Sequence, residues 1–164
     1  MSLIDDYKNA SDDQKVEILS DIEFEDIPGK WEFLRSVIAD KEEYDLARIE
    51  ALKIIEIAPL TDEEFPPFCA LLVSIIKTEP DYDVKNYAVM ASKNFVNDSE
   101  ELKELIIKMV LDPNEDQAIR HNAYAAVRAF FDLPGRKVVL EKLTTDKEFG
   151  KLAAMDLKEL HSTE

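Results

Sequence analysis

Hydrophobic residues recur along this chain at intervals of three and four positions, the spacing of one face of an α-helix. Leu102, Leu105, Ile106 and Met109 form one such stripe, and a second stripe runs through residues 119–130. No segment has the alternation of apolar and polar residues that is typical of a half-buried strand. The pattern therefore predicts an all-α protein.

Start and stop signals divide the stripes into separate helices. Ser11, Thr61 and Thr145 each precede a Gln or Glu by three positions, the spacing of a capping box, in which two side chains bond the free amides of a helix start. The Pro28-Gly29 pair indicates a break between helices. We therefore expect an opening helix near 11–22 and then four helix pairs, at 30–39 with 44–57, 63–77 with 84–96, 100–110 with 115–131, and 136–143 with 147–161.

A short motif recurs in the second helix of each expected pair. In residues 79–88 and 112–123, an acidic turn with a proline is followed by an apolar residue, a basic residue and, three positions later, an alanine. Weaker copies lie at 47–51 and 149–153. Such a period is typical of stacked helical repeats, in which each pair buries its apolar stripe against its neighbours. The copies align on Ala51, Ala88, Ala123 and Ala153, at spacings of 37, 35 and 30 residues.

The motif resembles that of the HEAT repeat, an antiparallel helix pair of about this length. The residues that match this motif most closely are Glu79-Pro80 with Val84-Lys85, and Asp112-Pro113 with Ile119-Arg120. The resemblance covers residues 30–161 and implies a right-handed α-α solenoid of about four helix pairs plus an N-terminal helix. Residues 1–27 would form an acidic N-terminal cap, and 28–164 the repeats of the same single domain. Proteins of this kind hold another macromolecule on a concave surface lined by their second helices.

The net negative charge of the chain limits the kinds of partner that it is expected to bind. With 36 acidic and 20 basic side chains among 164 residues, the formal net charge is −16. Such a chain is repelled by phosphate backbones and by anionic lipid, so we expect neither a nucleic-acid nor a membrane partner. Residues 1–27 hold nine acids and only two lysines. This acidic surface either serves solubility alone or attracts a basic protein partner.

The expected location is the cytoplasm. No apolar run approaches the roughly 18 residues that a membrane-spanning helix needs, and the first residues do not have the basic and apolar regions of a secretory signal. The single cysteine, Cys69, excludes an internal disulfide and fits a reducing compartment.

Two structural expectations concern large or charged side chains. Arg48, Lys85 and Arg120 occupy equivalent repeat positions, and equivalent positions form a column in a stacked array. We expect each to pair with a carboxylate in a turn of its own or a neighbouring repeat, because a partly buried basic group needs a partner. Trp31 is expected to pack beneath the opening helix as core. The carboxylates expected to pair with the column are Asp81, Asp83, Asp112 and Asp116.

Neighbouring columns supply candidate contact residues. These columns lie on the second helices, one, four or eight positions after the basic column. Helical geometry is expected to turn them away from the core stripe, toward the concave face or its edge. Tyrosine and arginine are also frequent in binding hot spots. For Tyr82 and Tyr87, packing between layers is an equally good interpretation. The candidate partner-binding residues are Tyr82, Asn86, Lys93, His121, Asn122, Tyr124 and Arg128, with Tyr87 beside them.

The sequence has no recognisable catalytic pattern. It contains two histidines and three glycines, with neither metal-ligand spacing nor a phosphate-binding loop. We therefore expect no catalytic residue, no metal and no cofactor. The predicted function is a non-enzymatic scaffold or adaptor for a protein partner. The alternative is an acidic immunity or anti-toxin protein that neutralises a basic partner, and a HEAT-like lyase or glycosylase is less favoured.

Overall fold

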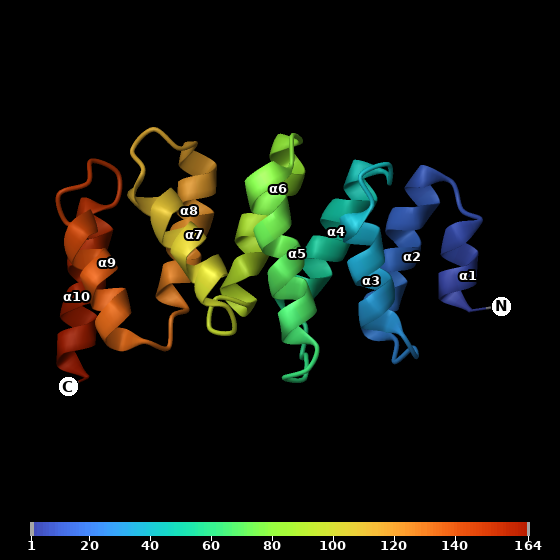
Figure 1. Ribbon diagram of the computed structural model, residues 1–164, viewed down its shortest axis with the longest axis horizontal. Coiled ribbons are helices and arrows are strands. Elements are labelled where there is room, and N and C mark those ends of the chain that lie inside the picture. The colour runs from blue at the N-terminus through green and yellow to red at the C-terminus, as the bar shows by residue number, and fades with distance from the viewer. Residues whose placement is uncertain (1, 164) are drawn as a thin grey trace.

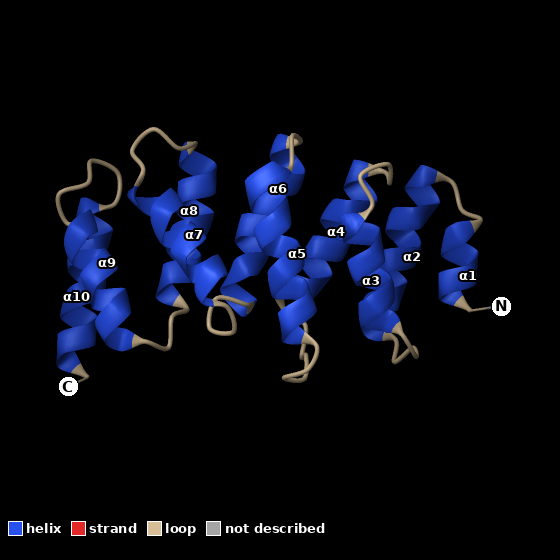
Figure 2. Cartoon of the chain, in the orientation of Figure 1, coloured by secondary structure: helices blue, strands red, loops and turns tan. Residues whose placement is uncertain are grey.

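The computed structural model describes residues 2–163, and every regular element in that range is helical (Figures 1 and 2). The all-α prediction is therefore confirmed for this part of the chain. The elements are α1 (Leu3–Lys8), α2 (Asp12–Phe24), α3 (Lys30–Ala39), α4 (Asp45–Glu56), α5 (Phe65–Thr78), α6 (Tyr82–Ala91), the 3-10 turn η1 (Ser92–Asn94), α7 (Glu100–Leu111), α8 (Gln117–Arg128), α9 (Leu133–Leu143) and α10 (Gly150–Ser162).

The helices stand side by side in a row, with the N-terminus at one end and the C-terminus at the other (Figure 1). Each odd-numbered helix packs against the even-numbered helix that follows it, so the described chain forms five consecutive pairs. Along the row, α2 packs on α4, α4 on α6 and α6 on α8, which we call the even row. The turns within pairs lie along the upper edge of Figure 1, and the connections between pairs lie along the lower edge.

The N-terminal segment differs from the prediction of a single opening helix. Residues 3–8 form a short helix that packs on α2. Ser2 and Asp5 form a capping box at its start, and the ring of Tyr7 is buried edge-on against Phe33, with centroids 5.1 Å apart. A helix of six residues is too short to display an apolar stripe, which is why the pattern did not reveal it.

Most predicted helix boundaries hold within about three residues, although the helix predicted at 84–96 ends at Ala91 and continues as the turn η1. The Ser11 box is confirmed, with the Ser11 amide donating to Gln14 Oε1 at 3.1 Å. At Thr145 the predicted box is wrong, because Asp146 Oδ1 instead accepts from the amides of Glu148 and Phe149, at 2.9 and 3.1 Å. The last helix consequently begins at Gly150.

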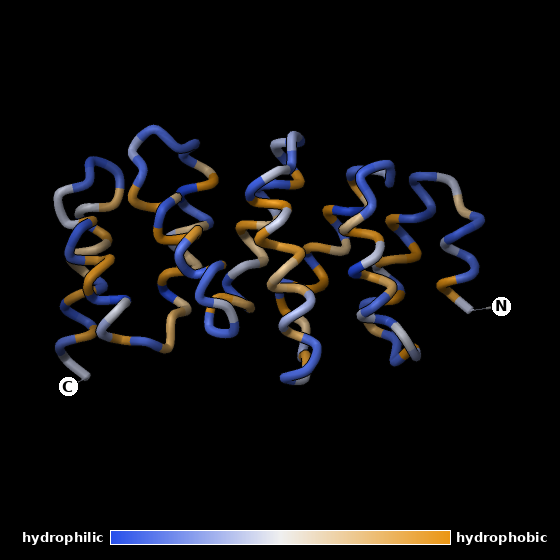
Figure 3. Tube along the Cα trace, viewed as in Figure 1, coloured by the Kyte–Doolittle hydropathy of each residue, from blue (hydrophilic) through white to orange (hydrophobic). Residues whose placement is uncertain are grey.

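A continuous core lies between the helices. Figure 3 shows hydrophobic segments recurring along each helix, whereas the upper turns are mostly hydrophilic. The buried side chains form one cluster that extends from the first pair to the last. The four aligned alanines all have no exposed surface, as their place in the motif predicts, and they are Ala51, Ala88, Ala123 and Ala153.

Candidate functional site

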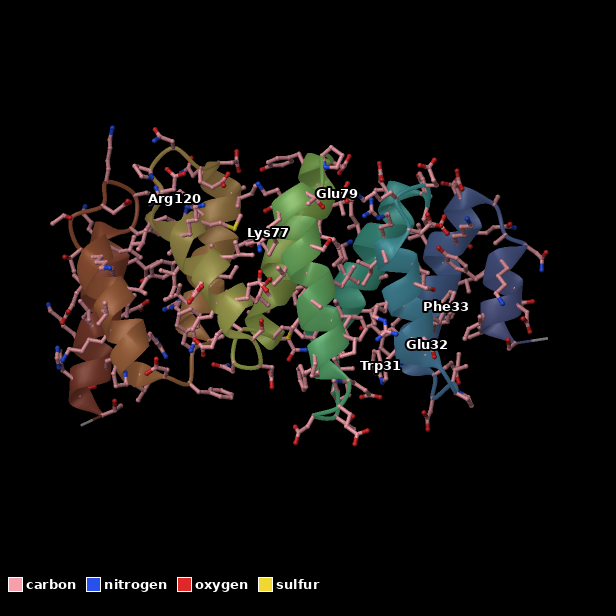
Figure 4. The ribbon with its side chains drawn as sticks, viewed as in Figure 1. Trp31, Glu32, Phe33, Lys77, Glu79 and Arg120 are labelled. Carbon is pink, nitrogen blue, oxygen red and sulfur yellow. The ribbon has the colours of Figure 1, made fainter. Side chains whose placement is uncertain are left out.

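The basic column fixes neighbouring pairs to one another. Arg48 is 2% exposed; its Nε donates to the Ile38 carbonyl at 3.1 Å, and its Nη2 lies 2.7 Å from Glu79 Oε2. The carbonyl belongs to the last turn of α3, where backbone oxygens have no helical partner. The carboxylate belongs to the turn of the next pair, at the top of α5 in Figure 4. One side chain therefore caps its own pair and holds the next.

Arg120 repeats this arrangement two pairs further on. Its guanidinium donates to the Val110 carbonyl, and its Nη2 lies 2.6 Å from Asp146 Oδ2 in the following turn. Burial raises the pKa of the Asp146 carboxyl, but the hydrogen bonds from Arg120, Phe149 and Glu148 outweigh burial, so its pKa lies below the ordinary value. The ionised form is thus favoured in the folded protein.

The same column includes a residue that the sequence analysis did not assign to it. Lys15 Nζ lies 2.7 Å from Glu43 Oε1 in the next turn, and Lys85 Nζ lies 4.0 Å from Glu115 Oε2 in its next turn. The expectation that column members pair with acidic turns is correct. The predicted carboxylates were wrong, because each side chain reaches forward to a different acid of the following pair; the wrongly predicted acids are Asp81, Asp83, Asp112 and Asp116.

The predicted contact residues of α6 bond to the next pair. Tyr82, 46% exposed, donates from its hydroxyl to Asp116 Oδ1 at 2.8 Å, and this bond raises the pKa of Tyr82. Asn122 Nδ2 donates to Asn86 Oδ1, also at 2.8 Å. These contacts join α6 to α8 and to the turn before α8. Tyr82 and Asn86 of α6 therefore help to hold neighbouring pairs in register.

Lys93 and His121 are tied in the same way. Lys93 forms an ion pair with Glu56, at the end of α4. His121 Nε2 lies 2.9 Å from Glu148 Oε1, and its ring meets Phe149 edge-on with centroids 4.9 Å apart. Half of the His121 side chain remains exposed. Each contact again crosses from one pair to the next.

Tyr124 and Arg128 converge on a buried carboxylate. Asp156 of α10 is 2% exposed and accepts a hydrogen bond from the Tyr124 hydroxyl at 2.6 Å and one from Arg128 Nη2 at 2.9 Å. Tyr124 itself is 3% exposed and stacks on Phe149. Burial raises the pKa of Tyr124, and the Asp156 carboxylate adds to this effect.

Tyr124 is buried, although the sequence predicted that it would face away from the core. Leu52 and Val89, at the equivalent positions of α4 and α6, are buried too. The reason is that the next pair along the row covers this side of each helix as well. α4 packs on α6 and α6 on α8, and Tyr124 stacks on Phe149 and bonds to Asp156 of the last pair. Tyr124 cannot present its ring to a partner in this structure.

A groove at the lower edge, which sequence reasoning missed, leaves apolar surface open. It lies between the α2–α3 connection and the α4–α5 connection and has a volume of about 720 Å³. Phe24, Trp31, Pro59, Pro67 and Phe68 supply its apolar lining. We call it the Trp31 groove. Trp31 was expected in the core, but it is only half-buried, and Figure 4 places it between the lower parts of α3 and α5.

Local structure holds the lip of the groove in place. Gly29 adopts φ +76°, a left-handed conformation that favours glycine, and so allows the chain to turn directly into α3. Lys30 Nζ then bonds to the carbonyls of Glu23 and Glu25, at 2.6 and 3.1 Å, and lies 4.8 Å from the centroid of the Trp31 ring. The end of α2 is thereby fastened to the first turn of α3.

Two large apolar side chains beside the groove point into solvent. Phe24, the last residue of α2, is 82% exposed, and Ile57, directly after α4, is 69% exposed. Ile57 and Trp31 line a smaller adjoining hollow with Phe24. The Asn94 side chain stabilises this connection, because its Nδ2 donates to the Ile55 and Ala58 carbonyls at 2.9 and 3.2 Å.

One sequence signal could have indicated the groove. Ile22 belongs to the buried stripe of α2, and Phe24 follows two positions later. Two positions correspond to about 200° around a helix, so both residues cannot face the same core. A large apolar residue on the polar side of a helix end is a candidate for contact with another molecule.

Carboxylates without partners surround the apolar lining. Glu25, Asp26, Glu32 and Glu63 line the groove and form no side-chain hydrogen bond or ion pair with the described residues. Among the lining bases, Lys30 is already bonded to backbone carbonyls. The groove therefore combines an apolar surface with a negative rim, which suits a ligand that is both apolar and basic.

Residues 2–163 contain no group of three or more His, Cys, Asp and Glu side chains arranged to hold a metal ion, and no helix in that range is long and apolar enough to cross a membrane.

Comparison with known proteins identifies no relative: no family model matches the chain, and neither curated proteins nor solved structures give a significant match.

Proposed function

We propose that this protein is a non-enzymatic protein-binding module, a cytoplasmic adaptor built as a right-handed HEAT-like solenoid. The solenoid is supported by antiparallel helix pairs that follow one another in a row and by the basic column, whose members each reach the next turn. In a stacked array, such repeated contacts keep successive pairs in register. An elongated row of this kind offers a large surface to a second protein.

The observation that carries the binding function is the exposed apolar surface at the Trp31 groove. Phe24 and Ile57 leave most of their side-chain surface in water, next to the half-buried Trp31. Contiguous apolar surface with a polar rim is characteristic of interaction sites, and aromatic anchors at such sites supply much of the binding energy. We place the main contact there.

The even row remains the second proposed contact zone. Tyr82, His121 and Arg128 keep about half of their side-chain surface exposed while they bond to neighbouring pairs. A partner on this face would meet a surface held rigid by those bonds, which lowers the entropic cost of binding. The predicted residues of this zone are Tyr82, Asn86, Lys93, His121, Asn122 and Arg128.

Site-specific photocrosslinking tests the proposal and separates the two zones. A benzoylphenylalanine is placed at Ile57 beside the groove, at Ala125 on α8, or at Met155 on α10, all of which are exposed. In lysate of the source cell, we expect a discrete protein adduct from the Ile57 position, which Phe24→Ser should weaken. An adduct confined to Ala125 would move the binding site to the even row. Equal adducts at all three positions, or none, would contradict the proposal.

A second candidate function, neutralisation of a basic toxin-like partner, is favoured by the acids of α2. Asp12, Asp13, Glu17 and Asp21 form no ion pair or hydrogen bond through their side chains with the described residues. Unpaired surface carboxylates accelerate encounter with a basic protein. A neutralising protein abolishes the activity of its partner when it binds, whereas an adaptor leaves that activity intact, so an activity assay of the captured partner distinguishes the two.

A further inference from the structure

We infer that the Trp31 groove accepts a basic linear segment of the partner protein, in which large apolar side chains are flanked by lysine or arginine. This inference rests on the proposed protein-binding function and adds the chemistry of the ligand. It commits the groove to a peptide, because both an apolar anchor and positive charge are needed to match the two parts of its lining.

The apolar part of the groove requires an anchor side chain. Phe24, Trp31 and the buried Phe68 are among the residues that line it. The volume of about 720 Å³ falls in the range of sites that enclose a ligand larger than one side chain. Covering the exposed face of Phe24 with an apolar group removes that face from water, which favours binding.

The charged part of the groove requires a cation. Glu25 and Asp26 follow the C-terminus of α2, where the helix dipole is already negative and unfavourable to carboxylates. The last turn of α2 contains no basic residue. Lys30 relieves this by bonding to two backbone carbonyls, but the carboxylates of Glu25 and Asp26 stay unpaired among the described residues.

Other parts of the groove lining also carry negative charge. Glu32 on α3 and Glu63 before α5 add two more unpaired carboxylates. Against these, Arg35 is the lining base that has no bond to another described residue. An acidic segment would therefore be repelled, a neutral apolar segment would gain nothing from the rim, and a basic apolar segment would satisfy both parts.

Trp31 gives a direct readout, because it is the only tryptophan of the chain. The probe is a capped peptide of sequence Gly-Lys-Lys-Leu-Phe-Lys-Lys-Gly, titrated into the whole protein while the tryptophan emission is recorded. Three control peptides replace all lysines by glutamate, all lysines by glutamine, or the Leu-Phe pair by Ser-Ser. We expect a saturable change in emission with the basic apolar peptide and affinity at least tenfold lower for each control.

A pair of protein variants separates local charge from net charge. The groove variant carries Glu25→Gln, Asp26→Asn and Glu32→Gln. The control variant carries Glu104→Gln, Glu141→Gln and Glu159→Gln on exposed positions of α7, α9 and α10 and has the same net charge. We expect the groove variant to bind the basic apolar peptide with about tenfold lower affinity than the parent, and the control variant to lose much less affinity. Circular dichroism verifies that both variants are folded.

The inference fails if the glutamine or serine peptide binds as tightly as the basic apolar one, if both variants weaken binding equally, or if no peptide binds. None of these results affects the proposed function, which is judged by the adduct formed from Ile57. Absence of that adduct would contradict the proposed function, regardless of the results with the peptides.

Discussion

Arg48 and Glu79 form a buried ion pair between two different helix pairs, with Nη2 and Oε2 2.7 Å apart and only 2% and 4% of the two side chains exposed. The Arg48 Nε also satisfies a carbonyl at the end of α3. Because the contact joins elements 31 residues apart in sequence, it links the packing of one pair to the position of the next.

Arg48→Ala should lower the free energy of unfolding by about 3–5 kcal/mol, because it leaves the Glu79 carboxylate buried without its cation. The matched control is Lys77→Ala, which removes an ion pair with Glu101 whose side chains are 49% and 60% exposed. An exposed pair contributes about 0–1 kcal/mol. Urea denaturation of both variants measures the difference, and equal losses would show that the basic column does not stabilise the row.

Ala123→Glu should destabilise the protein by about 3 kcal/mol or more, because Ala123 has no exposed surface and a carboxylate there would be buried without a partner. Ala125→Glu, on the exposed side of the same helix, is the control. Thermal melts that leave both variants unchanged would mean that α8 does not face its neighbours as described.

The Asp146–Arg120 contact predicts a specific dependence of stability on pH. Because the folded-state pKa of Asp146 lies below its unfolded value, the contact stabilises the folded protein fully at neutral pH. This contribution should fade as the pH falls below about 4 and through the lowered pKa. Asp146→Asn should therefore be less stable than the parent at pH 7, and the difference should shrink in acid. A difference that stays constant between pH 7 and pH 3 would contradict the assignment.

Tyr124→Phe should reduce stability rather than partner binding. The change removes the hydroxyl that donates to the buried Asp156 and leaves Arg128 as the remaining bonded partner of that carboxylate. A buried group that loses a hydrogen bond costs about 1–3 kcal/mol. Denaturation should detect this loss, while partner affinity measured on folded protein stays the same. A loss of affinity without a loss of stability would instead make Tyr124 a contact residue.

Much of the fold could be predicted from local signals. Residues close together in the sequence determine the helical periodicity, the Ser11 capping box and the break at Pro28-Gly29. The structure has these elements where the sequence indicates them. The short α1 escaped because its six residues hold too little pattern, and its place depends on Tyr7 packing against Phe33 of the next pair.

The surfaces were harder to predict because they depend on which helices become neighbours. Tyr124 has the composition of a contact residue, yet packing between pairs buries it against Phe149. Trp31 was expected in the core, but the turn at Gly29 places it at the lip of a groove. Phe24 could have been recognised from its position off the stripe of α2, whereas the carboxylates around it become a rim only after α3 and α5 are placed.

The most direct test of the account is the dissociation rate of the partner that cross-links at Ile57, measured by surface plasmon resonance. The test variant is Phe24→Ser with Ile57→Ser. The control is Phe131→Ser, which changes another highly exposed aromatic, 84% in solvent, in the connection between α8 and α9. If the Trp31 groove is the binding site, the partner should dissociate from the double variant about tenfold faster than from the parent, or faster still. Its dissociation from the control should match that from the parent. Unchanged dissociation in the double variant, or equal acceleration in the control, would contradict the central claim.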